Sequence, residues 1–263
     1  ESFIASEKLK KHVELFINKG GMYCCYNGNL LLHGCMPVDE KGNFQEFSYG
    51  GHKYSGKKLL DFFDKKIRSI FYCDCREDNG LFFYLWQGQY SPLFGKCDMT
   101  TFERYFIEDK ATHEEVKNAY YKLRDNEEFC IKLLNEFGLT SEGHIINGHT
   151  PVKETKGENP IKANGRTIVI DGGMSRAYHK TTGHGGYTLT YNSYGLQIMS
   201  HDIFQSKEES IKNETDIIST KRVVDKLCRK KVVDTDSGVK ILKQIELLKI
   251  LLEEYRQGTI CER

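Results

Sequence analysis

The chain has 263 residues, of which 39% are hydrophobic and 12% aromatic, so it can bury the core of one large domain or two small ones. Its 38 basic and 37 acidic residues give a net charge of +1, which gives no reason to expect a nucleic-acid or membrane partner. No apolar run approaches the ~18 residues that span a bilayer, and the charged start of the chain does not resemble a signal peptide.

Nine irregularly spaced cysteines without a C-x-x-C pair predict reduced thiols and a cytoplasmic location. Because the first residue is Glu1 and not methionine, we expect the sequence to begin inside a longer polypeptide or to have been processed.

In the first half of the chain, apolar spacing predicts helices over residues 5–19 and 56–70. Between them, strands at 22–26 and 29–32 flank the pair Asn27-Gly28, which is typical of a tight hairpin. The continuous apolar run at 81–86 predicts a strand buried on both faces.

Residues 87–111 look irregular, and a helix over 113–137 should end at Gly138. Short strands separated by turns are then predicted at 144–148, 160–163, 166–171 and 186–192. The pair Asn164-Gly165 marks a second hairpin.

After about residue 205 the pattern becomes helical and charged, and residues 240–256 predict a helix packed on the body. These elements predict one mixed α/β domain. Within it, residues 1–205 form a core with the irregular 87–111 insertion, and residues 206–263 form C-terminal helices.

Two apolar strands end in a histidine that is followed closely by glycine or proline. His33 follows Leu30-Leu31-Leu32, and His149 follows Ile145-Ile146-Asn147-Gly148. A lone histidine is usually a solvated side chain, and that interpretation suits His12, His52 and His113. Two strand-end histidines instead indicate one shared site, because neutral imidazole is a good ligand for borderline metal ions. Such a site needs further ligands.

A third apolar strand, residues 168–170, ends at Asp171 and two glycines. Carboxylates commonly complete metal sites that hydrolyse phosphoesters, so Asp171 is a candidate ligand. It is equally a candidate for capping the turn or orienting a histidine.

Two further groups are candidates for binding a substrate phosphate. The glycine-rich stretch containing Gly185 and Gly186 could expose backbone N–H groups to an anion, although its composition favours a flexible turn. Lys96 and Arg104 lie in the irregular segment, where loops often carry ligand contacts. Most such charges are ordinary surface residues.

An ordered set of motifs resembles a known family. His-Gly-x-x-Pro at 33–37, Gly-His-Thr-Pro-Val at 148–152 and Ile-Asp-Gly-Gly at 170–173 look like the C-terminal half of the calcineurin-like metallophosphoesterases. The chain resembles the class 3 fructose-1,6-bisphosphatases of Firmicutes more strongly, and this resemblance covers almost the whole sequence. The segments that carry it are 26–34, 91–96, 101–106, 145–152, 160–165 and 186–189.

The resemblance implies a gluconeogenic enzyme that removes the 1-phosphate of fructose 1,6-bisphosphate and leaves fructose 6-phosphate. It implies an α-β-β-α sandwich and a site for two divalent metals, typically manganese. His33 and His149 would be ligands of one metal. The implied chemistry is an in-line displacement at phosphorus, with both ions clamping the phosphoryl oxygens.

The chain departs from the family in lacking three N-terminal motifs, Gly-Asp-x-His, Gly-Asp-x-x-Asp-Arg-Gly and Gly-Asn-His-Asp/Glu. It contains no Gly-Asp and no Asn-His dipeptide. We therefore expect it to be the C-terminal portion of a metallophosphatase, with the bridging carboxylate and the acid/base histidine encoded upstream. Such a fragment should be inactive alone and should associate with its N-terminal portion or form a homo-oligomer.

Two alternatives remain open at this point. The chain could belong to another calcineurin-like phosphoesterase, such as a protein or diadenosine tetraphosphate phosphatase. It could also be a non-catalytic fragment that binds a sugar phosphate or mediates oligomerisation.

Overall fold

The computed structural model describes residues 2–3, 5–73, 79–204, 206–214, 219–224 and 229–260. Contacts divide the chain into a first unit, residues 1–183, and a second unit, residues 184–263. This division falls earlier than the 205/206 subdivision that the sequence predicted, because the strands of residues 186–201 pair with a later strand rather than with the first unit. No helix among the described residues is long and apolar enough to cross a membrane.

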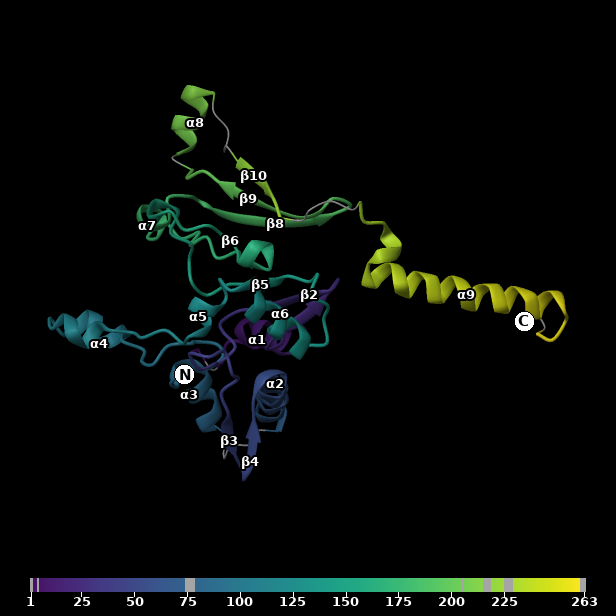
Figure 1. The fold of residues 1–263 in the computed structure, drawn as a ribbon, viewed down its shortest axis with the longest axis horizontal. Helices are drawn as coiled ribbons and strands as arrows, with labels where there is room; N and C mark the ends of the chain where they lie inside the picture. Colours follow the sequence, from purple (N-terminus) through teal and green to yellow (C-terminus); the bar gives the residue numbers. More distant parts are fainter. Residues whose placement is uncertain are drawn as a thin grey trace. The chain divides into compact units, whose positions relative to one another are not determined.

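The first unit is built on a five-stranded mixed sheet (Figure 1). Its strands, in spatial order, are β1 (Cys24–Tyr26), β2 (Asn29–Leu32), β5 (Ile145–Asn147), β7 (Thr167–Val169) and β6 (Ile161–Lys162). The three central strands β2, β5 and β7 run parallel, and the outer strands β1 and β6 are antiparallel to their neighbours. The carboxyl ends of the parallel strands therefore meet at one edge of the sheet, where open α/β sheets bind ligands.

Both predicted hairpins are confirmed. Asn27 and Gly28, between β1 and β2, have φ values of 50° and 74°, so both adopt the left-handed conformation that a type I′ turn requires. Asn164 and Gly165, between β6 and β7, have φ values of 53° and 94°. A small β3–β4 hairpin, Phe47–Tyr49 with His52–Tyr54, stands apart from the main sheet.

The predicted helices near the start of the chain are confirmed as α1 (Glu7–Lys19) and α2 (Gly56–Cys73). The predicted helix over 113–137 is instead two helices, α5 (Tyr120–Leu123) and α6 (Glu127–Glu136). The break has a local cause, because Asn126 caps α6 by accepting a hydrogen bond from the Phe129 N–H at 2.8 Å. The core of the unit contains apolar side chains of β2, α2, α5 and α6.

The predicted strand at 81–86 is wrong, because these residues form helix α3 (Asn79–Gln87). Leu81 and Leu85 are buried one helical turn apart, whereas Phe83 and Trp86 are 59% and 61% exposed. A short apolar run has no periodicity that separates a buried strand from a helix. The segment predicted to be irregular also contains a short helix, α4 (Thr101–Phe106), and a 3₁₀ turn at Lys110–His113.

The second unit contains an antiparallel sheet in the order β10-β9-β8. Its members are β8 (Gly186–Asn192), β9 (Gly195–His201) and β10 (Ser219–Val223), preceded in the chain by α7 (His179–Thr182) of the first unit. Only β8 was predicted from the sequence. Beyond residue 205 the chain is thus not wholly helical, although α8 (Lys207–Asn213) and α9 (Asp236–Arg256) are helices.

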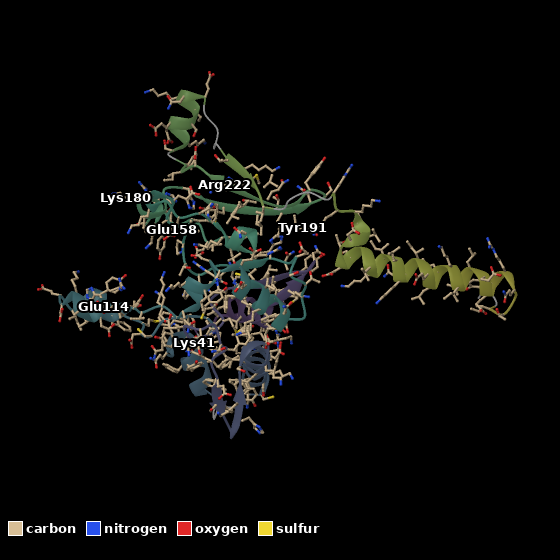
Figure 2. All side chains as sticks on the ribbon, viewed as in Figure 1. Lys41, Glu114, Glu158, Lys180, Tyr191 and Arg222 are labelled. Atoms are coloured by element: carbon tan, nitrogen blue, oxygen red, sulfur yellow. The ribbon has the colours of Figure 1, made fainter. Side chains whose placement is uncertain are left out.

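Helix α9 confirms the predicted helix over 240–256 but not its predicted packing. Gly238 is its only buried residue, and side chains project along its whole length (Figure 2). Ile245 is 41% exposed, Leu248 is 62% exposed and Leu252 is 49% exposed. The other described residues of the second unit therefore leave the apolar face of α9 uncovered.

Candidate functional site

The two strand-end histidines lie side by side. His33 follows β2 and His149 follows β5, and the parallel register pairs Leu32 with Asn147 at the ends of these strands. His33 Nε2 lies 3.1 Å from His149 Nδ1, and the two ring centroids are 5.0 Å apart. Residues 116 positions apart in sequence are thus brought together by one pair of parallel strands.

The backbone around the pair is tightly turned. His149 has a φ of 66°, a left-handed conformation that is uncommon outside glycine and asparagine. The Gly148 N–H donates to the His33 carbonyl at 3.2 Å. Gly34 is required next to His33, because a Cβ there would lie 2.2 Å from the Pro92 carbonyl oxygen. The 91–93 loop therefore passes directly against the His33 strand end.

The environment keeps His149 neutral. Burial lowers the pKa of the His149 imidazole, and the neighbouring His33 and Lys96 lower it further. A neutral ring nitrogen is the form that binds metal ions. Two ligands each about 2.1 Å from one ion are about 3.0 Å apart when their bonds meet at a right angle, so the observed 3.1 Å fits a shared ion.

The described residues supply only this pair of donors. Across the described ranges, no group of three or more histidine, cysteine or carboxylate side chains lies close enough to hold a metal. Since a bound divalent ion needs more than two ligands, His33 and His149 fit one side of a metal centre.

Asp171, the third predicted residue, lies beyond β7 at the same sheet edge. Its carboxylate accepts a hydrogen bond from the Gly173 N–H at 3.0 Å, and its carbonyl accepts one from the Val152 N–H at 3.0 Å. Its charge also raises the pKa of His149, although the lowering effects are larger. In this structure Asp171 caps its turn while acting electrostatically on the histidine pair.

Asn147 has a structural role that the sequence did not reveal. Its fully buried Nδ2 donates to the carbonyls of Leu32, His33 and Gly34, at 3.3, 3.1 and 2.8 Å. Its Oδ1 accepts from Arg124 Nη1 at 2.6 Å. One amide thus fixes the strand end that carries His33 and links it to Arg124. The available signal was a polar residue in the buried strand Ile145–Asn147.

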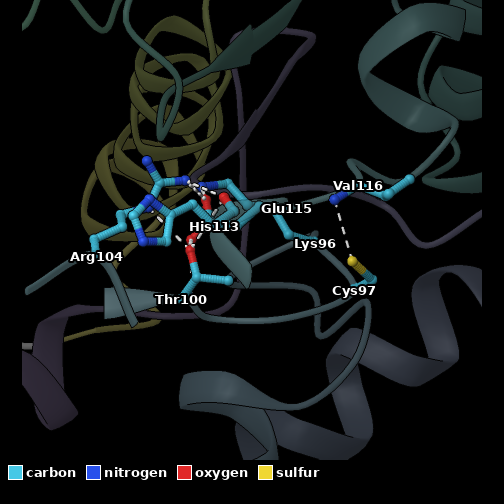
Figure 3. Close-up of polar contacts among 7 residues, drawn as sticks. All are labelled: Lys96, Cys97, Thr100, Arg104, His113, Glu115 and Val116. Atoms are coloured by element: carbon cyan, nitrogen blue, oxygen red, sulfur yellow. Dashed lines mark hydrogen bonds and ion pairs between the residues drawn. The ribbon is translucent and has the colours of Figure 1, made fainter. Parts of the chain in front are cut away.

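Lys96 and Arg104 converge on Glu115, as Figure 3 shows. Lys96 Nζ lies 2.5 Å and Arg104 Nη2 lies 3.6 Å from a Glu115 oxygen, and Arg104 Nε donates to Thr100 Oγ1 at 2.9 Å. Burial alone would raise the pKa of Glu115, but hydrogen bonds from Lys96 and Thr100 lower it overall. The two predicted phosphate contacts therefore share one cluster, in which a carboxylate already binds them.

Gly185 and Gly186 lie in the second unit. The Gly185 N–H donates to the His201 carbonyl at 2.7 Å, and the Gly186 N–H donates to His184 Nδ1 at 3.1 Å. Both N–H groups are thus used within the unit, which leaves neither of them available to an anion in this conformation.

Comparisons with known proteins agree with one another. A family model described as Firmicute fructose-1,6-bisphosphatase matches residues 1–257. Relatives named fructose-1,6-bisphosphatase class 3 include one from Listeria monocytogenes serotype 4b, 52% identical over 99% of this chain and 41% of the relative. One from Clostridium acetobutylicum is 53% identical over 99% and 40%, and one from Ligilactobacillus salivarius is 57% identical over 95% and 40%.

The chain spans about two fifths of the length of these curated relatives, 40% or 41% in each of the three. No solved structure matches it.

Proposed function

Because the chain belongs to the Firmicute fructose-1,6-bisphosphatase family, we propose that it forms part of an enzyme that hydrolyses the 1-phosphate of fructose 1,6-bisphosphate to give fructose 6-phosphate. The observation that carries the proposal is the His33–His149 pair, 3.1 Å apart at the carboxyl ends of two parallel strands. The reaction would take place in the cytoplasm as a step of gluconeogenesis.

The histidine pair is proposed to hold one of two manganese ions. Such ions neutralise charge on phosphoryl oxygens and activate water. Burial in this chain keeps His149 in the neutral, ligating form. Asn147 fixes the His33 backbone, and Asp171 adds negative charge near His149 while capping its own turn. The backbone of the His33 strand end is thus held by buried hydrogen bonds from outside the pair.

The remaining ligands are proposed to come from another part of a longer protein. Two imidazoles cannot complete a binuclear centre, and the chain spans only about two fifths of its relatives. In this proposal the sheet of the first unit is one layer of an α-β-β-α sandwich, and the chain is its C-terminal portion. The bridging carboxylate and the acid/base histidine would belong to the portion that this chain lacks.

The exposed apolar face of α9 is proposed to be an assembly surface. The following residues on it are spaced alternately by four and three positions, as in a coiled-coil seam: Ile241, Ile245, Leu248, Leu252 and Tyr255. The remainder of the longer protein or a second copy of the chain would cover this seam. A strictly monomeric full-length protein whose α9 exchanges amide hydrogens rapidly would contradict the proposal.

The proposed activity is tested in a chimera, in which this chain replaces the matching segment of the Listeria monocytogenes relative. With manganese, the chimera should release phosphate from fructose 1,6-bisphosphate and prefer it to phosphopeptides and dinucleotides. His33→Ala and His149→Ala should each abolish turnover, whereas His52→Ala, at an exposed position on β4, should preserve it. Full activity in the His33→Ala chimera would overturn the assignment.

The isolated 263-residue chain provides the complementary test. Since it presents one side of a centre, we expect no phosphate release from fructose 1,6-bisphosphate when manganese is added. Metal-dependent turnover by the purified chain would show that the chain itself completes the site.

A further inference from the structure

Apart from the histidine pair, the first unit contains a cavity beside Thr150 and Pro151. It has a volume of about 510 Å³, within the range of small-molecule sites. The segment from Lys117 to Asp125 forms one wall, and the chain that leaves β5 forms another. Neither the proposed metal site nor the predicted phosphate contacts include this cavity.

The cavity is lined by more positive than negative charge. Five basic residues face three carboxylates, and the basic set is Lys117, Lys122, Arg124, Lys153 and Lys162. Two of the carboxylates already bind other groups of the chain. Asp125 pairs with Lys162 at 2.9 Å, and Glu158, labelled in Figure 2, accepts a hydrogen bond from the Lys153 N–H at 3.0 Å. Glu40, the third, is exposed.

Three of the cations have no anionic partner. Within the described ranges, no carboxylate lies at ion-pair distance from Lys117, Lys122 or Lys153. Desolvation lowers the pKa of the Lys117 ammonium, and repulsion from Arg124 and Lys153 lowers it further, whereas attraction to Glu158, which also lines the cavity, opposes these effects without cancelling them. Together with Arg124, these side chains concentrate like charge that a bound anion would relieve.

Buried polar atoms on the cavity wall also lack partners. Arg124 is 7% exposed and Thr150 is 8% exposed. Arg124 Nε and Thr150 Oγ1 have no hydrogen-bond partner among the described residues. Buried polar groups are nearly always paired, so such atoms indicate a missing partner. The Arg124 guanidinium and the Lys117 ammonium both lie over the Tyr121 ring, at 5.1 and 5.5 Å, so both cations contact the same aromatic side chain of the cavity wall.

We propose that this cavity binds the phosphoryl group of a phosphate monoester, with Lys117, Arg124 and Lys153 as its cationic contacts. A planar guanidinium flanked by ammonium groups is well suited to a compact dianion with several acceptor oxygens. The phosphoryl group is either the one that the enzyme leaves on its sugar or that of a separate phosphorylated molecule.

The cavity is linked to the histidine pair by two successive hydrogen bonds. Arg124 Nη1 donates to Asn147 Oδ1 at 2.6 Å, and Asn147 Nδ2 donates to the His33 carbonyl at 3.1 Å. A ligand that orders Arg124 therefore also restrains the strand end carrying His33. This anion site needs no metal, so its occupancy can be measured separately from the proposed hydrolysis.

The test is a calorimetric titration of the full chain with inorganic phosphate, in EDTA and at constant ionic strength. One saturable site is expected. Lys117→Gln and Lys153→Gln should each weaken binding by about tenfold or more, because each removes a charge-assisted hydrogen bond. Both lysines are at least partly exposed, so the variants should fold. Lys243→Gln with Lys249→Gln, on exposed turns of α9, alters the net charge at least as much and should bind like the wild type.

The source of the phosphoryl group is then separated by competition. Fructose 6-phosphate that displaces inorganic phosphate identifies the sugar phosphate, and simultaneous binding of both identifies a separate phosphorylated molecule. Either result supports the anion site. Absence of saturable phosphate binding, or equal affinity in the Lys117→Gln and Lys153→Gln variants and the wild type, overturns it.

Discussion

Replacing the buried Asn147 by alanine should strongly destabilise the first unit. The side chain is fully buried and contacts three carbonyl oxygens and Arg124. Its two amide hydrogens make about two full hydrogen bonds, worth about 1 kcal/mol each, and the charge-assisted bond from Arg124 adds about 1.5–3 kcal/mol. The expected loss in the free energy of unfolding is therefore about 3.5–5 kcal/mol.

Urea denaturation followed by circular dichroism measures this loss. Asn135→Ala, at an exposed position in the last turn of α6, is the matched control and should change stability by no more than about 0.5 kcal/mol. If Asn147→Ala loses less than about 1 kcal/mol, the buried amide does not hold the strand end. The link from Arg124 to His33 would then also fail.

Three further changes give distinct results. The pKa of His149 is lowered in the fold, so the folded protein loses stability as the pH drops from about 6.5 to the folded pKa of this imidazole. His149→Gln should flatten the pH dependence of the urea midpoint between about pH 7 and 5. An unchanged pH dependence would contradict the lowered pKa of His149. Gly34→Ala forces a Cβ against the Pro92 carbonyl and should cost about 2–3 kcal/mol, whereas Gly80→Ala meets nothing within 4 Å and should not destabilise α3. Glu115→Gln should cost about 1–2 kcal/mol at pH 7, and the cost should shrink as the pH falls from about 4.5 through the lowered pKa of the wild-type carboxyl.

Local turn chemistry allowed two hairpins of the first unit to be predicted from the sequence. Tight hairpin turns require positive φ, which asparagine and glycine tolerate, and both hairpins form where Asn27-Gly28 and Asn164-Gly165 predict them. The histidine pair could also be anticipated, since parallel strands bring their carboxyl ends together. The distance between the two rings and the neutral state of His149 depend on tertiary packing, which no local sequence pattern predicts.

Long-range contacts explain what the sequence did not show. The helix at Asn79–Gln87 was mistaken for a strand because only tertiary burial separates Leu81 and Leu85 from their exposed neighbours. Glu115 had no sequence signal, yet it is the carboxylate that binds Lys96 and Arg104. Opposite charges 19 and 11 positions apart become partners only after the chain between them has folded.

The cavity beside Thr150 also could not be predicted from the sequence. Its cations come from α5 and the residues on either side of it, from the loop after β5 and from β6, and none of them forms a basic cluster in the sequence. Arg124 connects this cavity to Asn147, whose polar side chain in an apolar strand was the one visible hint. Sites assembled from several loops depend on the arrangement of the strands that carry them.

The most direct test of the account is pulsed electron paramagnetic resonance of manganese bound to the chimera that carries this chain. We predict that His33→Ala and His149→Ala each remove the coupling of manganese to one imidazole nitrogen, and that the double variant removes both couplings. Manganese that shows no nitrogen coupling, or the same coupling after both histidines are replaced, would contradict the claim that this pair holds the metal.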